Sequence, residues 1–169
     1  KIFIYFFLFL IIGTLNNKEI NNFELTKITK IGVVGLDQKN NIEIKNSLDY
    51  LKKNNLFFLN KLKITDLINS NSLVENFSVY KIYPSSLNIL ISRAKLLAQV
   101  EKNGEIFYLG SNGKLIKEIG IKVKLPFIFG DFDNESFFEL KKKIDKTNFN
   151  FNEIKNLIFF KSGRWDIET

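Results

Sequence analysis

The chain has 169 residues and a formal net charge of +7, with 45% hydrophobic and 25% charged residues, which is the balance of a globular protein and not of a disordered one. It has no Cys and no His. Their absence excludes disulfides, thiolate chemistry, imidazole-based triads and the usual zinc and copper ligand sets. Catalysis by carboxylate, Ser or Lys stays formally open.

The composition is skewed in a way that bears on the charge. Nearly all basic residues are lysines, and Asn and Ile are abundant. This pattern is typical of an AT-rich genome, so part of the basic excess can be mutational drift. The chain also has no Met, and an initiator Met is rarely trimmed before Lys. We therefore expect a fragment that is clipped at its N-terminus, and also at its C-terminus, within a strand.

The first segment is strongly apolar. Residues 2–12 form an unbroken apolar run, and no charged residue lies between Lys1 and Lys18. A membrane-spanning helix needs roughly 17–25 apolar residues. We predict an N-terminally clipped transmembrane anchor over residues 1–17 and a juxtamembrane linker over residues 18–26. A cleavable signal peptide and a buried core helix or strand are the alternatives, and the sequence 13–15 is a poor cleavage site.

The next region, residues 27–95, predicts the order strand, helix, helix, strand, strand. A β-branched stretch from Ile28 ends at Gly35, and Asn40 or Asn41 is the expected N-cap of the first helix. An apolar face continues this helix to residue 51, and a second short helix ends near Asn69. Two alternating strands around the turn 83–86 then predict a hairpin with one buried face. The positions on that face are Leu87, Ile89 and Ile91.

The second half, residues 96–169, predicts a β-rich unit with one helix. Asn103-Gly104 suits a type I′ turn, because both central residues need positive φ. The expected strands and apolar segments are residues 96–102, 105–109, 114–119, 125–130, 156–161 and 164–169, and the expected helix is 135–146. Together the two halves predict an α+β protein.

Five motifs in this order resemble one known family. They are 28–35 (ITKIGVVG), the hairpin 74–93 with Tyr83-Pro84 at its turn and Arg93 at its end, the turn 112–113, the segment 125–130 (LPFIFG) and 163–167 (GRWDI). The chain resembles the cell-division protein family FtsQ, called DivIB in Gram-positive bacteria, and the composition suits an AT-rich Gram-negative bacterium. Ser92, Lys95 and Gly110 depart from the residues that the family usually has.

The resemblance implies a fold and a location. The fold is an N-terminal anchor helix, a βααββ POTRA domain at 27–95, and a mostly antiparallel β-domain with one or two helices at 96–169. The location is the cell inner membrane, crossed once, with the bulk of the protein in the periplasm at the division septum. The implied role is a non-enzymatic divisome scaffold that recruits and links septal proteins and helps to control septal peptidoglycan synthesis.

The resemblance also implies partners and binding positions. The partners are the membrane proteins FtsB and FtsL. The strands of this family that make the main contact with them would lie beyond residue 169 of this sequence. The turn and strand positions that it implies are Tyr83, Pro84, Arg93, Arg164 and Trp165, which are more simply structural residues. No cofactor, metal, nucleic acid or small-molecule substrate is implied.

Some residues of the sequence also fit an enzyme site. Asp131, Asp133 and Glu135 could form a metal or glycosidase site, but they read better as a solvated loop without the glycine and distal Glu of a calcium loop. Ser85-Ser86 with Lys95 could be a Ser/Lys pair, but turn chemistry explains the serines.

Three further alternatives concern partners. Abundant Phe with basic charge could indicate nucleic-acid binding, although the Phe residues fall at core periodicities. The net charge of +5 over residues 27–93 could instead bind anionic lipid, at roughly 1 kcal/mol per close Lys. A POTRA-bearing subunit of an outer-membrane assembly or secretion system is the alternative function, and it predicts a downstream β-barrel.

Overall fold

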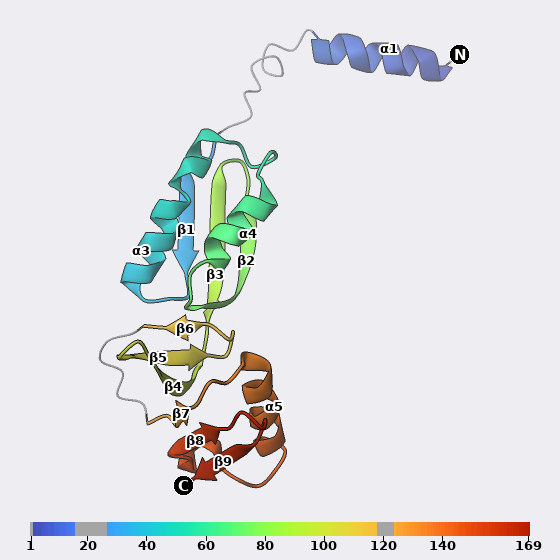
Figure 1. Cartoon of the computed structure of the whole chain (residues 1–169). Helices are drawn as coiled ribbons and strands as arrows, with labels where there is room; N and C mark the ends of the chain where they lie inside the picture. The colour runs from blue at the N-terminus through green and yellow to red at the C-terminus, as the bar shows by residue number, and fades with distance from the viewer. Residues whose placement is uncertain (1, 16–26, 118–123) are drawn as a thin grey trace.

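The structure is a computed structural model that describes residues 2–15, 27–117 and 124–169 (Figure 1). Two sheets, each with helices beside it, make it an α+β protein, as predicted. The N-terminal elements are α1 (Ile2–Leu15), β1 (Lys30–Val34), α3 (Gln38–Ser47), the 3-10 helix η1 (Asp49–Lys53), α4 (Lys61–Asn69), β2 (Val74–Ile82) and β3 (Ser86–Arg93). The C-terminal elements are β4 (Leu96–Lys102), β5 (Glu105–Gly110), β6 (Leu115–Ile116), β7 (Phe127–Phe129), α5 (Asn134–Ile144), η2 (Phe151–Glu153), β8 (Asn156–Phe159) and β9 (Trp165–Glu168).

Helix α1 contains 14 residues, and its large side chains are exposed along its whole described surface. Across residues 2–15, 27–117 and 124–169, no helix combines the length and the apolar character that crossing a bilayer requires. The anchor expected over residues 1–17 therefore stays a prediction. The linker expected over residues 18–26 lies outside the described residues.

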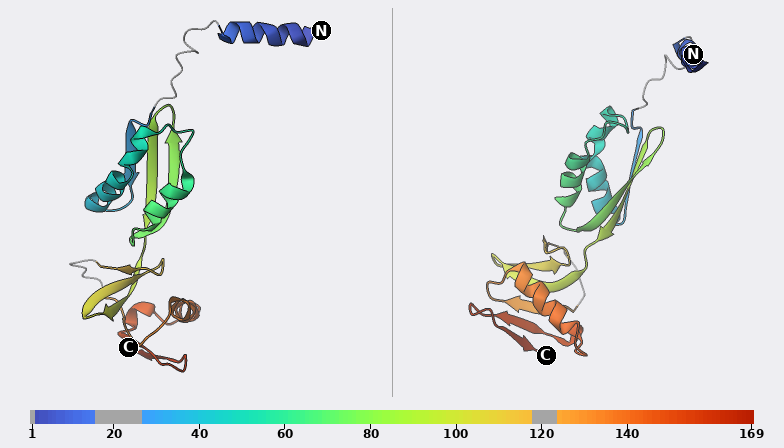
Figure 2. Two further views of the ribbon diagram at one scale, coloured as in Figure 1. Left: turned by 45° about the horizontal axis from the view of Figure 1, so that its top comes forward. Right: turned by 90° about the vertical axis from the view of Figure 1, so that its right-hand side faces the viewer.

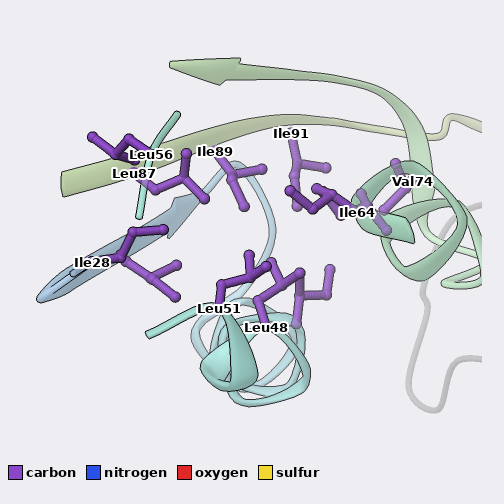
Figure 3. Close-up of a cluster of buried hydrophobic side chains, with 12 residues drawn as sticks. Ile28, Leu48, Leu51, Leu56, Ile64, Val74, Leu87, Ile89 and Ile91 are labelled. Carbon is purple, nitrogen blue, oxygen red and sulfur yellow. The ribbon is translucent and has the colours of Figure 1, made fainter. Parts of the chain in front are cut away.

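The first sheet has the strand order β1-β3-β2, with β1 parallel and β2 antiparallel to the central β3. Helices α3 and α4 cover one face of it, and no helix of the described residues covers the other face (Figure 2). The side chains of β3 that point to the helices are buried, as the alternation of the sequence predicted. Figure 3 shows this core, which is made by Ile28, Ile31, Ile44, Leu48, Leu51, Leu56, Ile64, Ile68, Val74, Leu87, Ile89 and Ile91.

The start of α3 corrects the sequence prediction. The N-cap is Asp37, not Asn40 or Asn41, because the Asp37 carboxylate accepts a hydrogen bond from the backbone N–H of Asn40. Asp is among the best N-cap residues, and its side chain satisfies an amide that the helix cannot pair. Asn41 instead pairs its side-chain amide with the backbone of Leu36, accepting from its N–H and donating to its carbonyl.

The apolar face predicted from Ile44 to Leu51 is real, but it is not a single α-helix. The α-helix ends at Ser47, and the chain continues as the 3-10 helix η1. Both segments direct apolar side chains into the same core. The strand predicted from Ile28 begins at Lys30, although Ile28 is itself buried.

The second sheet has the order β6-β5-β4-β7-β8-β9. Three of its neighbouring pairs are antiparallel, and the β4–β7 and β7–β8 pairs are parallel. The expected turn at Asn103-Gly104 has positive φ at both residues, 56° and 77°. Helix α5 packs beside this sheet (Figure 2). The core is formed by Ala98, Leu109, Ile128, Phe137, Ile144, Ile154 and Leu157.

Several strands of the second half are shorter than the sequence indicated. The strand expected over 114–119 is the two-residue β6, and residues 118–119 lie outside the described residues. The last two strands stop at Phe159 and Glu168. Helix α5 begins at Asn134 because Asp133 is its N-cap, with its carboxylate 2.8 Å from the backbone nitrogen of Ser136.

A third, small core joins the two sheets. It contains Leu73, Ala94 and Ile116, which come from the end of the first unit, the connection and β6. Asn112 adds two hydrogen bonds across this junction, from its Nδ2 to the carbonyls of Ser72 at 2.9 Å and Val74 at 2.8 Å. The junction is therefore packed and hydrogen-bonded, and it is not a bare linker.

Candidate protein-interaction surfaces

The strand edges are the first candidate surfaces. Strands β1 and β2 form the edges of the first sheet, and β6 and β9 form those of the second among the described residues. An edge strand has backbone N–H and C=O groups that its own sheet does not pair, and a partner strand can pair them. Strand β2 is the longest of these edges, with nine residues, whereas β6 has two.

A groove of about 490 Å³ runs between this long edge and helix α4. Its apolar side chains are Ile64 of α4, Phe77 and Val79 of β2, and Leu59 of the segment before α4. Lys61 and Lys81 complete the lining. A strand that paired with β2 would direct every second side chain to this side of the sheet. The arrangement thus offers backbone pairing and an apolar recess side by side.

The last hairpin contains two of the positions implied by the family resemblance. Trp165 packs against the rings of Phe159, Phe132 and Phe137, with centroids 4.8, 5.9 and 6.4 Å away. Arg164 is exposed, lies 4.6 Å from the Phe160 ring centroid and pairs with Asp166 at 3.0 Å. Trp165 is thus part of a core, whereas Arg164 is a surface residue.

The other three implied positions lie on the first unit. Tyr83 and Pro84 form the turn between β2 and β3, joined by a cis peptide bond, and the Tyr83 ring lies 5.3 Å from that of Phe57. Arg93 ends β3 and pairs with Val74, at the opposite end of the same sheet. The five positions therefore do not form one site, and their role in binding stays a prediction.

Of the three carboxylates considered for an acid site, Asp133 has a structural role. Asp133 caps α5 as described above, and the described residues contain no group of three or more acidic side chains arranged to hold a metal ion. Ser85 contacts Thr29 near the β2–β3 turn, with 3.0 Å between the two hydroxyl oxygens. Lys95 lies at the junction, where its backbone N–H donates to Ser111. The serines and this lysine are therefore not paired.

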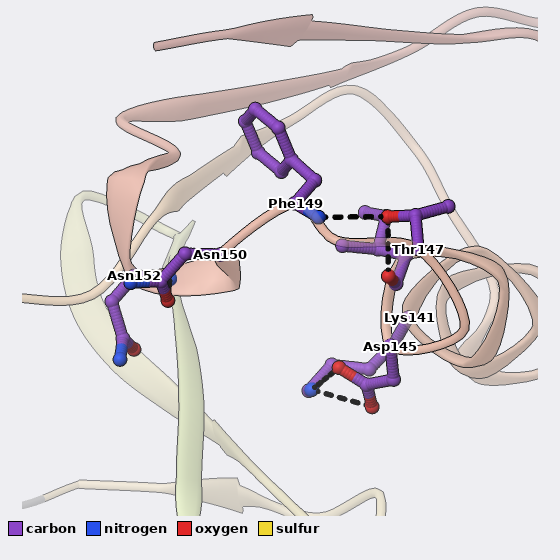
Figure 4. Close-up of polar contacts among 7 residues, drawn as sticks. Lys141, Asp145, Thr147, Phe149, Asn150 and Asn152 are labelled. Carbon is purple, nitrogen blue, oxygen red and sulfur yellow. Dashed lines mark hydrogen bonds and ion pairs between the residues drawn. The ribbon is translucent and has the colours of Figure 1, made fainter.

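A recess of about 390 Å³ lies beside the end of α5 (Figure 4). Lys141 pairs with Asp145 at 2.7 Å on its wall. The Thr147 hydroxyl donates to the carbonyl of Ile144 and accepts from the N–H of Phe149. These polar groups bond to one another and to the backbone where the helix ends and the chain turns. The recess is therefore a feature of the helix end and does not indicate a binding site.

In the part of the chain that the structure describes, Asp37 and Tyr50 have shifted pKa values, and both shifts have structural causes. Hydrogen bonds from the side chain and backbone N–H of Asn40 lower the pKa of Asp37, as is expected for an N-cap carboxylate. Burial raises the pKa of Tyr50. The Asp37 carboxylate caps α3, and Lys63 Nζ makes a cation–π contact 4.6 Å from the Tyr50 ring centroid, so these structural contacts account for both groups without a reactive centre.

The sequence analysis missed one surface. The loop after η1 lies at the end of the first sheet, where Lys27 pairs with Asn55. In this loop the side chains of Phe57 and Phe58 are 57% and 74% exposed. Leu62, at the start of α4, is 75% exposed. The available signal was an apolar run, 56–59, that fits neither a helix nor a strand period and is flanked by Lys and Asn.

The βααββ order of the first unit is that of a POTRA domain, and a comparison with known families gives the same class. Residues 26–92 match the family model described as POTRA domain, FtsQ-type. The chain therefore carries a POTRA domain, a protein-interaction module made here by β1, α3, α4, β2 and β3. The match supports the assignment of the chain to the FtsQ/DivIB family, which its motifs had indicated. No curated protein matched the chain.

Proposed function

We propose that the chain is a non-enzymatic scaffold of the bacterial cell-division machinery. The observation that carries this proposal is the FtsQ-type POTRA domain, joined through a packed junction to a second sheet. Both sheets have edge strands that can accept a strand from another protein. The FtsQ-type match favours division over an outer-membrane assembly or secretion role.

The proposed partners are FtsB and FtsL, and the proposed activity is to recruit and link septal proteins and so to help control septal peptidoglycan synthesis. The proposed location is the inner membrane, with the two folded units in the periplasm. Helix α1 supports this location, because a helix that is apolar all round is stable only inside a protein core or a membrane. In the sequence, this helix lies N-terminal to the POTRA domain.

The test is a pull-down in detergent with the protein as its gene encodes it and the FtsB and FtsL homologues of the same bacterium. Recovery of either homologue is the expected result, and recovery of neither contradicts the scaffold proposal. Two variants on β2 then ask whether its groove takes part. Val79→Asp places a charge in the groove and should reduce recovery, whereas Asn76→Asp, exposed on the other face of the same strand, should not.

A further inference from the structure

We propose that the end of the POTRA domain where Lys27 pairs with Asn55 docks on an anionic lipid bilayer, with lysines at the headgroups and with Phe57, Phe58 and Leu62 at the acyl boundary. We call this surface the tip. This inference rests on the proposed membrane location and adds a second lipid contact, made by the folded domain itself.

Contacts between three separate segments of the chain build the tip. Lys27 forms a β-bridge with Asn55, and Thr29 hydrogen-bonds the carbonyl of Ser85. The ring centroids of Phe57 and Tyr83 are 5.3 Å apart, so the loop after η1 contacts the β2–β3 turn. The tip is therefore one surface, built from residues 27–30, 49–63 and 80–86, and it lies at the end of the sheet away from the second unit (Figure 1).

The loop that exposes the aromatic side chains of the tip is fixed by Asn55 and Leu56. The side-chain oxygen of Asn55 accepts from the N–H groups of both Phe57 and Phe58, each at 3.1 Å. Leu56, between them and Asn55, is fully buried and fixes the loop to the core. Exposed aromatic and apolar side chains beside lysines are the pattern of segments that bind the membrane interface.

The charge of the POTRA domain is concentrated at the same end. The tip segments contain seven lysines and one acidic residue, Asp49, whereas the rest of residues 27–93 contains three basic and four acidic residues. Mutational drift toward lysine codons would not separate the charges in this way. The tip lysines are Lys27, Lys30, Lys52, Lys53, Lys61, Lys63 and Lys81.

The chain that joins helix α1 to the POTRA domain favours a bilayer over an acidic protein as the partner of the tip. The Cα atoms of Leu15, which ends the apolar helix α1, and Lys27 are twelve residue steps apart. A fully extended chain covers at most about 3.6 Å per step, so these atoms are within about 43 Å of each other. A bilayer that holds α1 is thus always near the tip, and the effective concentration of lipid there is high.

The test uses residues 27–169, because all three cores are built from Ile28 onward and the segment keeps every core residue. Without α1, any binding must come from the folded units. Co-sedimentation is measured with phosphatidylcholine vesicles, and with vesicles that also contain phosphatidylglycerol. Binding should need the anionic lipid and weaken as salt rises, because salt screens exposed charges.

Two triple variants with equal charge change test the position of the contact. Each tip lysine close to the surface contributes about a fivefold factor in partitioning. Lys52→Gln, Lys53→Gln and Lys61→Gln together should therefore lower partitioning by about a hundredfold. The control, Lys142→Gln, Lys143→Gln and Lys146→Gln, removes the same charge from exposed positions on and after α5 and should have little effect.

A fluorescence reporter tests insertion. Trp165 is the only Trp, so Trp165→Phe with Phe58→Trp gives a single reporter at the tip. Its emission should shift to the blue on anionic vesicles, whereas native Trp165, in the second unit, should not respond. Binding that ignores lipid charge, equal losses in both triple variants, or no shift of the tip reporter would each overturn the proposal. A chain that recovers FtsB or FtsL but fails these tests loses the lipid contact alone.

Discussion

At the scale of single residues, two glycines explain why the motifs that end in Gly need it. Gly35 follows β1 with φ of +121°, and a Cβ there would lie 1.8 Å from the carbonyl oxygen of Ile91 in β3. Gly130 follows β7 with φ of +98°, and its Cβ would lie 2.2 Å from the carbonyl oxygen of Phe159 in β8. Each glycine ends a strand that runs parallel to the neighbour it approaches. The same local requirement thus occurs once in each sheet.

Gly35→Ala is expected to destabilise the POTRA domain by about 2–4 kcal/mol, because it combines an unfavourable φ with a collision against backbone. Gly104→Ala is the matched control. Gly104 also has positive φ, 77°, but nothing lies within 4 Å of its added Cβ, so its cost should be only about 1–2 kcal/mol. Urea unfolding of both variants measures the difference. Equal losses would show that φ strain alone, and not close approach, fixes Gly35.

At the scale of elements, the sequence predicted what local patterning controls. The alternation of β3 and the Asn103-Gly104 turn are correct because each depends on residues close in sequence. The predicted N-cap of α3 was wrong, because Asp37, Asn40 and Asn41 are all good capping residues. Only the fold shows which side chain reaches the free backbone amide. The parallel pairing of β7 with β4 and β8 depends on contacts between segments distant in sequence, which no local pattern encodes.

The same limit applies to the candidate surfaces. The strand edges could be anticipated from the family resemblance, but the tip could not, because its three segments are brought together only by tertiary contacts such as Lys27 with Asn55 and Phe57 with Tyr83. Trp165 and Arg164 are neighbours in the sequence, and their different environments also appear only in the fold.

The β8–β9 hairpin offers a direct test of that difference. Trp165→Ala should destabilise the second unit by about 2–4 kcal/mol, because it removes a ring packed among three Phe rings. Arg164→Ala should cost about 0–1 kcal/mol, since its ion pair with Asp166 is exposed. Thermal unfolding followed by circular dichroism measures both. A large loss in the Arg164 variant would contradict the assignment of Arg164 as a surface residue.

At the scale of the whole molecule, the junction determines whether the two units act as one body. The connection from Arg93 to Leu96 contains only two residues between strands. Besides the Asn112 bonds, Ser111 donates to Glu75, and Lys114 donates to the carbonyl of Asn69. A short connection, a small shared core and several cross-junction hydrogen bonds are expected to couple the unfolding of the two units.

Asn112→Ala should uncouple them. It removes both bonds to the carbonyls of Ser72 and Val74, which should cost about 1–3 kcal/mol at a part-buried site. In residues 27–169, urea unfolding followed by Trp165 fluorescence reports the second unit, and circular dichroism reports both. The two transitions should coincide in the wild type and separate in Asn112→Ala. Asn134→Ala, which loses one exposed bond to the carbonyl of Gly113 within the second unit, should leave them coincident. If the transitions are already separate in the wild type, the junction does not couple the units, and the scaffold presents its edges from two independent bodies.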